Sequence, residues 1–185
     1  MIFMKKLMKK ALVGILAATM MFGSVCTAYA ATGSATEAPV LTKQESVKAD
    51  NGTKVNTSSK GTATVTAVKK TTKKSVSVDS KVTVNGVSYT VTKIGANTFA
   101  NAKKATKVTL PATIKSIGAK AFTGAKSVKT IVINSKKAVS VSKTAFKGVD
   151  TKKMTIKVTN MSKKQLKAFK ANLKKAGFKG KVKTA

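Results

Sequence analysis

The chain has 185 residues, 37 of them basic and 5 acidic, and its formal net charge is +32. All 37 basic residues are lysine, and the sequence contains one cysteine and no histidine, arginine or tryptophan. These absences exclude imidazole acid–base catalysis and most thiol and metal chemistry. We therefore predict a protein that is not an enzyme and that needs no cofactor or metal.

The first 30 residues have the pattern of a secretory signal peptide. The basic segment MIFMKKLMKK and the apolar segment ALVGILAATMMFGSVC precede a cleavage site whose small residues are Ala28 and Ala30. An uncleaved membrane anchor is the alternative, but the apolar run of about 16 residues is shorter than the ~20 that span a bilayer. Cys26 lies in this segment, so we expect an exported mature chain without disulfides or a transmembrane segment.

Residues 31–58 mix small, polar and charged residues without apolar periodicity, and they are predicted to form a flexible leader. In residues 59–92, alternating apolar and polar residues predict strands with one buried face. The pair Asn85-Gly86 separates two such runs, which is typical of a β-hairpin with a type I′ turn. We expect these strands and the hairpin to cap the first repeat.

A six-residue motif then recurs along the chain. IGANTF begins at Ile94, IGAKAF at Ile117 and the weaker VSKTAF at Val141, and each copy precedes a short apolar strand. A period in the range of 20 to 29 residues with one strand per repeat is typical of a leucine-rich-repeat solenoid. The sequence predicts an α+β repeat fold with two to three 23–24-residue repeats in residues 93–160. The third copy lacks the glycine, so we expect any irregularity there.

Two residue types in the motif have structural interpretations. Gly95 and Gly118 occupy a position that needs either positive φ or a close backbone approach. Phe99, Phe122 and Phe146 are predicted to form a stacked ladder inside the solenoid.

Residues 161–185 are predicted to form a capping helix followed by a basic tail. Ser162 and Gln165 match a capping box. Leu166, Phe169 and Leu173 fall on one helical face, and a glycine follows the last turn. We expect this apolar face to cover the end of the solenoid.

The motifs resemble the BspA-like leucine-rich repeat, in which a strand and a proline are followed by an Ile-Gly and an Ala-Phe pair. The resemblance covers about residues 82–160, including Val108-Thr109-Leu110-Pro111. It implies a secreted or surface-exposed bacterial protein from a family associated with adhesion to host components or other cells. It also implies a protein without assigned enzymatic activity.

The repeat strands suggest a candidate ligand face. If the apolar residues of each strand point inward, the residues between them point outward. The candidate site residues are Lys107, Thr109, Thr130, Val132, Thr155 and Lys157. An ordinary solvated sheet surface is the alternative interpretation.

The lysine excess has three interpretations, because a strongly basic surface attracts any polyanion in a salt-dependent way. It is a solvated coat, or it retains the protein on anionic wall polymers or host glycans, or it binds nucleic acid. Nucleic-acid binding is disfavoured because base readout favours arginine and single-strand binding needs exposed aromatic residues.

We predict a monomeric binding or adhesion module that is secreted, extracellular or cell-wall associated, and whose partner is a host or cell-surface protein or glycan. The alternative is a structural accessory held electrostatically on anionic wall polymers without a specific ligand.

Overall fold

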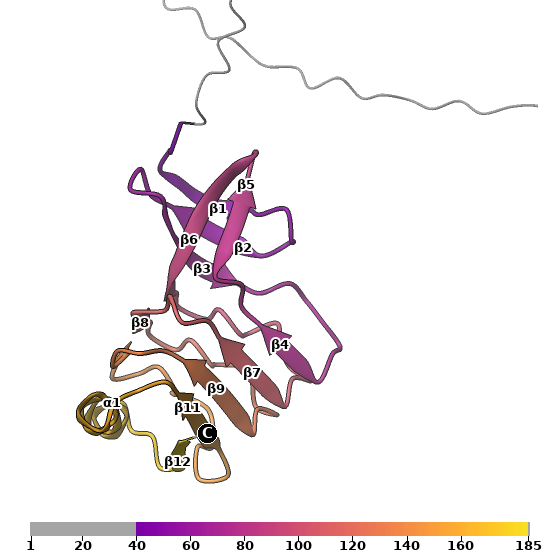
Figure 1. Ribbon diagram of the computed structural model, residues 1–185. Coiled ribbons are helices and arrows are strands. Elements are labelled where there is room, and N and C mark those ends of the chain that lie inside the picture. Colours follow the sequence, from indigo (N-terminus) through magenta and orange to yellow (C-terminus); the bar gives the residue numbers. More distant parts are fainter. Residues whose placement is uncertain (1–39, 185) are drawn as a thin grey trace, which may run out of the picture. The chain divides into compact units, whose positions relative to one another are not determined.

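The computed structural model describes residues 40–184 (Figure 1). The predicted signal peptide, with its cleavage residues Ala28 and Ala30, lies outside the described residues, as do residues 31–39 of the predicted leader. The elements are β1 (Gln44–Lys48), β2 (Lys54–Thr57), β3 (Thr62–Ala67), β4 (Ser75–Ser77), β5 (Lys81–Val84), β6 (Val87–Ile94), β7 (Lys107–Leu110), β8 (Ser116–Ile117), β9 (Thr130–Asn134), β10 (Ser140–Val141), β11 (Thr155–Thr159), α1 (Lys163–Lys175) and β12 (Lys181–Thr184).

The predicted flexible leader is wrong over residues 44–48 and 54–57, which form β1 and β2. These strands pair antiparallel with each other, and β2 pairs antiparallel with β3. Val55 is fully buried and Thr57 is 5% exposed. Only two valines, Val47 and Val55, mark this segment as apolar, so its alternation is too sparse to recognise without the neighbouring strand β3.

The predicted hairpin is confirmed. Strands β5 and β6 pair antiparallel, with Val84 opposite Val87. Asn85 and Gly86 have φ angles of 51° and 78°, the positive values that a type I′ turn requires. The long strand β6 continues into the repeats, because its last residue, Ile94, begins the first motif.

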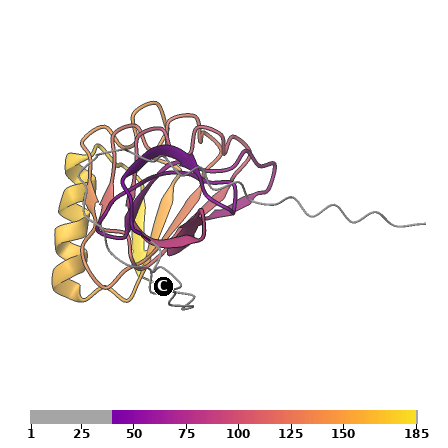
Figure 2. The ribbon, with the colours of Figure 1, turned by 90° about the horizontal axis from the view of Figure 1, so that it is seen from above.

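The repeats form a solenoid whose coils are joined by two parallel ladders of strands. One ladder, which we call the long-strand ladder, consists of five strands in the order β12-β11-β9-β7-β4. The apolar positions of these strands are in register, as in the row Val76, Val108, Ile131, Ile156 and Val182. On the other side of each coil, the short strands β8 and β10 continue the sheet that contains β6. Seen from above, the coils overlap and α1 runs along one side (Figure 2).

The interior of the solenoid is filled by a stack of phenylalanine rings, as predicted. Phe99 and Phe122 have ring centroids 4.9 Å apart and planes 14° apart, and Phe122 and Phe146 are 5.1 Å and 6° apart. Phe178, which follows the helix, adds a tilted ring 5.2 Å from Phe146. The stack therefore extends one coil beyond the three copies of the motif.

The motif glycines allow a close approach between coils. A Cβ atom on Gly95 would lie 2.8 Å from the Val65 carbonyl oxygen, and one on Gly118 would lie 2.9 Å from that of Ile94. Distances below 3.0 Å do not occur for real Cβ atoms, so the close approach is the reason for glycine. The third copy, where any irregularity was expected, pairs regularly: β10 keeps its register with β8, and the Ser142 N–H donates to the Ile117 carbonyl at 2.9 Å.

The predicted helix is confirmed as α1. The Ser162 hydroxyl accepts a hydrogen bond from the Gln165 N–H at 3.3 Å, but the Gln165 side chain does not complete the capping box. Its Oε1 atom accepts from the Ala138 N–H at 2.9 Å instead and ties the helix to the preceding coil. Phe169 and Leu173 are buried, whereas Leu166 is only partly buried.

The predicted basic tail forms a strand over residues 181–184, which the sequence pattern did not indicate. These residues form β12, which pairs in parallel with β11 from Thr155 opposite Lys181 to Val158 opposite Thr184. Four residues with one apolar side chain, Val182, gave too little pattern to indicate a strand, and the free edge of β11 supplies the partner. The long-strand ladder thus has five strands within residues 40–184, and the two caps stay predictions.

Candidate binding face

The six predicted site residues lie together on the outer face of the long-strand ladder, which we call the ladder face. Register places Lys107, Thr130 and Thr155 opposite one another in one row. Thr109, Val132 and Lys157 form the second row, two residues further along each strand. The two rows follow from the alternation of the strands, because one buried residue separates them on every strand.

The burial of the strand residues agrees with the predicted inward and outward positions. Val108, Leu110, Ile131, Ile133, Ile156 and Val158 are all at most 1% exposed. Lys107 and Lys157 are exposed, and the four residues between them on the face are partly exposed. With strands about 4.8 Å apart and a rise of about 3.3 Å per residue, the Cα atoms of the two lysines lie about 12 Å apart.

Four further positions, which were not predicted from the sequence, lie on the ladder face. Ser75 and Ser77 of β4 extend the two rows at one edge, and Lys181 and Lys183 of β12 extend them at the other. The only sequence signal for the β12 positions is Val182 between two lysines, which is too short to indicate a strand without the pairing with β11. The completed face holds four lysines and otherwise mostly hydroxyl side chains.

A polar cluster borders the ladder face at the ends of β9 and β11. The Thr159 hydroxyl and the Asn160 amide donate to Asn134 Oδ1 at 2.9 and 2.6 Å. Within the described residues, the single salt bridge joins Lys43 and Glu45, so no carboxylate there pairs with the lysines of the face. The face therefore presents its ammonium groups without neutralising partners.

In residues 40–184, no group of three or more aspartate, glutamate, cysteine or histidine side chains is arranged to hold a metal ion. The helix in this range is not long and apolar enough to cross a membrane.

Two solved structures are similar to the chain. One is a leucine-rich repeat protein from Bacteroides capillosus, with 21% identity and a TM-score of 0.48, covering 76% of this chain and 99% of that one. The other is a leucine rich cell surface protein from Faecalibacterium prausnitzii, with 17% identity and a TM-score of 0.42. This second similarity covers 82% of this chain and 44% of the Faecalibacterium protein. No curated protein matches the chain significantly.

A family model matches half of the chain. It describes the BspA type leucine rich repeat region, a model of 6 copies, and it matches residues 92–185. The match includes both glycine-containing motifs and extends through α1 and β12, beyond the limit of residue 160 set by the motifs alone. The matched range contains the phenylalanine stack and most strands of the two parallel ladders. The chain belongs to the BspA type leucine-rich-repeat family.

Proposed function

We propose that the protein is a secreted or cell-surface adhesion module that binds a protein or glycan through its ladder face. Leucine-rich-repeat families are in general binding modules without enzymatic activity, and binding of proteins is their usual role. A protein of similar fold from Faecalibacterium prausnitzii is described as a cell surface protein. The signal peptide predicted from residues 1–30 agrees with export.

The observation that carries the proposal is the fixed arrangement of side chains on the ladder face. The strand register fixes two rows of three residues on the face, with Lys107 and Lys157 at diagonally opposite ends. The other four residues are Thr109, Thr130, Val132 and Thr155. The strands that carry these residues each pair with a strand on both sides, so their backbones are already ordered. Binding a ligand therefore costs little backbone conformational entropy. Two positive charges at a fixed separation, with hydroxyl groups between them, match a ligand that carries acidic groups on a polar surface.

The test is binding of the mature chain to host matrix proteins, to glycan arrays and to stripped cell walls across a salt series. The variant Lys107→Glu/Lys157→Glu is compared with Lys126→Glu/Lys143→Glu, which makes the same change in net charge at exposed lysines in the turns between strands. We expect the first pair to weaken binding at least tenfold more than the second. Equal losses in the two variants would refute the ladder face as the ligand site.

The alternative function is a wall-associated accessory held by charge alone. The described residues contain 33 lysines and four acidic residues, an excess that attracts anionic wall polymers without any specific arrangement. In that case every interaction would disappear near ~1 M salt, where the screening length is about 3 Å. Binding to one host protein or glycan that persists at this salt concentration would instead support the adhesion module.

A further inference from the structure

The two sheets of the solenoid end differently at the N-terminal side. The sheet that contains the short strands continues past β6 to β3, β2 and β1. The long-strand ladder stops at β4, which pairs with β7 on one side and with no other strand of the described residues. One strand position next to β4 is therefore empty, and the edge of β4 presents unpaired N–H and C=O groups there.

A pocket of about 280 Å³ occupies this position. The continuous run from Ser75 to Asp79 lines it, and no residue of β7 does, so the pocket lies along the free edge of β4. On the other edge, β4 and its flanking residues bond to β7. The Val78 N–H donates to the Thr109 carbonyl at 3.0 Å, and the Lys74 carbonyl accepts from the Lys107 N–H at 3.0 Å.

The floor of the pocket is apolar and incompletely covered. It is formed by four valines that keep between 4% and 7% of their surface exposed: Val68, Val76, Val78 and Val82. The corresponding inward residues of β7, β9 and β11 are at most 1% exposed, because each has a neighbouring strand on both sides. A further strand beside β4 would bury this residual apolar surface.

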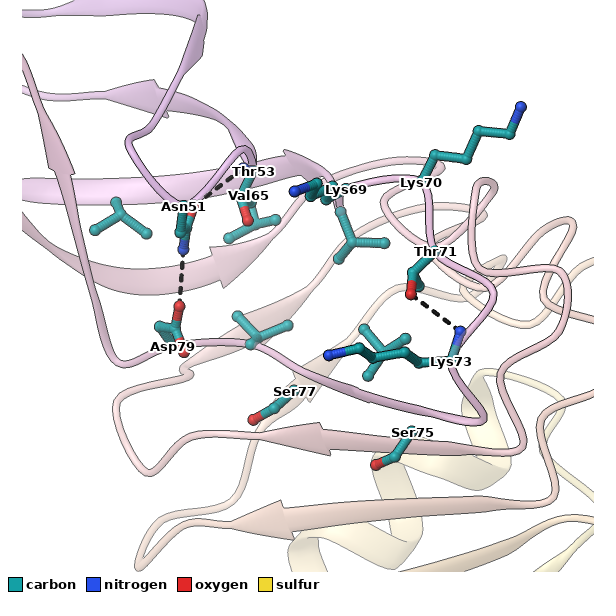
Figure 3. Close-up of a pocket in the computed structure, with 14 residues that line it drawn as sticks. Asn51, Thr53, Val65, Lys69, Lys70, Thr71, Lys73, Ser75, Ser77 and Asp79 are labelled. Carbon is teal, nitrogen blue, oxygen red and sulfur yellow. Dashed lines mark hydrogen bonds between the residues drawn. The ribbon is translucent and has the colours of Figure 1, made fainter. Parts of the chain in front are cut away.

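The rim of the pocket is basic. In Figure 3 the side chains of Lys69 and Lys73 extend over the pocket, whereas that of Lys70 points away from it. The acidic residue at one end, Asp79, accepts a hydrogen bond from the Asn51 amide at 2.7 Å. The charge that meets an incoming chain is thus positive along most of the groove, with one carboxylate at its end.

We propose that this groove binds an extended acidic peptide segment, which adds to the long-strand ladder as a strand beside β4. Backbone groups at the free edge provide the hydrogen bonds, the four valines accept alternate apolar side chains, and Lys69 and Lys73 pair with acidic ones. The five residues that line the groove from Ser75 to Asp79 correspond to about 17 Å of extended chain. The opposite edge of the ladder, β12, carries Lys181 and Lys183, so a second copy of this chain would bring like charges together.

The probe is a fluorescent seven-residue peptide that alternates glutamate and valine, and binding is measured by anisotropy at 0.15 M salt. We expect saturable one-to-one binding that Lys69→Glu and Lys73→Glu each weaken at least tenfold. Lys70→Glu makes the same change in net charge, but its side chain points away, so we expect less than a threefold effect. Amide exchange at Ser75 and Ser77 should slow when the peptide is bound, because their N–H groups become paired.

A second pair of probes tests the strand addition itself. The peptide is N-methylated either at its odd or at its even residues, since a strand uses only alternate residues to pair with one neighbour. One methylated form should lose binding and the other should keep it. Equal binding of both forms, or equal weakening by all three lysine variants, would overturn the proposal in favour of nonspecific attraction. A dimer in sedimentation equilibrium that removal of β12 dissociates would overturn it in favour of a second copy.

Discussion

Replacing Phe122 with leucine tests the contribution of the aromatic stack. Phe122 is fully buried and lies between two rings, at 4.9 Å from Phe99 and 5.1 Å from Phe146. An aromatic pair of this kind contributes about 0.5–1.5 kcal/mol beyond the burial of its area. Phe122→Leu keeps the site apolar but removes two pairs, so the stacking loss is about 1–3 kcal/mol in the free energy of unfolding.

The matched control is Phe99→Leu, since Phe99 is also fully buried but stacks on one ring only. The loss of area is the same in both variants, so urea denaturation should show Phe122→Leu to be less stable by about 0.5–1.5 kcal/mol. The double variant should show a coupling energy of similar size. Equal destabilisation by the two substitutions, with coupling below about 0.5 kcal/mol, would refute the stack as a source of stability.

Three further substitutions or truncations follow from the packing of the coils. Gly118→Ala places a methyl group 2.9 Å from the Ile94 carbonyl oxygen and should cost about 1–3 kcal/mol in urea denaturation, whereas Ser142→Ala at the equivalent position should stay within about 0.5 kcal/mol. Ser162→Ala removes the N-cap of α1 and should cost about 1 kcal/mol, with faster amide exchange confined to the first turn; unchanged exchange there would contradict the cap. Truncation after Gly180 removes β12 and should speed amide exchange in β11 more than in β9; equal rates would show that β12 contributes nothing.

The repeats were predictable because their signal is periodic. The spacing between Ile94, Ile117 and Val141 gave the coil, and the alternation in the strands gave the inward and outward positions of the ladder face. The hairpin was predictable for a local reason, since Asn85-Gly86 favours one turn type regardless of the rest of the fold.

The remaining elements depend on contacts between distant segments. Strand β2 acquires its structure from β3, and β12 from β11, and neither segment has enough apolar residues to show a period of its own. The groove beside β4 was unpredictable for the same reason, because it is defined by a strand that the ladder lacks. Short polar strands at the edges of sheets carry little sequence signal, since only one of their sides is packed.

The separate ends of the solenoid determine how it responds to tension. Figure 1 shows β1 in the N-terminal sheet and β12 at the opposite end of the coils. A pulling force between these ends acts along the direction in which coils are stacked, so it detaches outer coils one at a time instead of shearing all strands together. From β7 to β12 the register gives coils of 23, 25 and 26 residues (Lys107 to Thr130, Thr130 to Thr155 and Thr155 to Lys181), so each released coil lengthens the chain by about 80–90 Å at roughly 3.4 Å per residue. A tethered protein of this design would extend in steps of similar size and absorb mechanical work while the other coils stay folded.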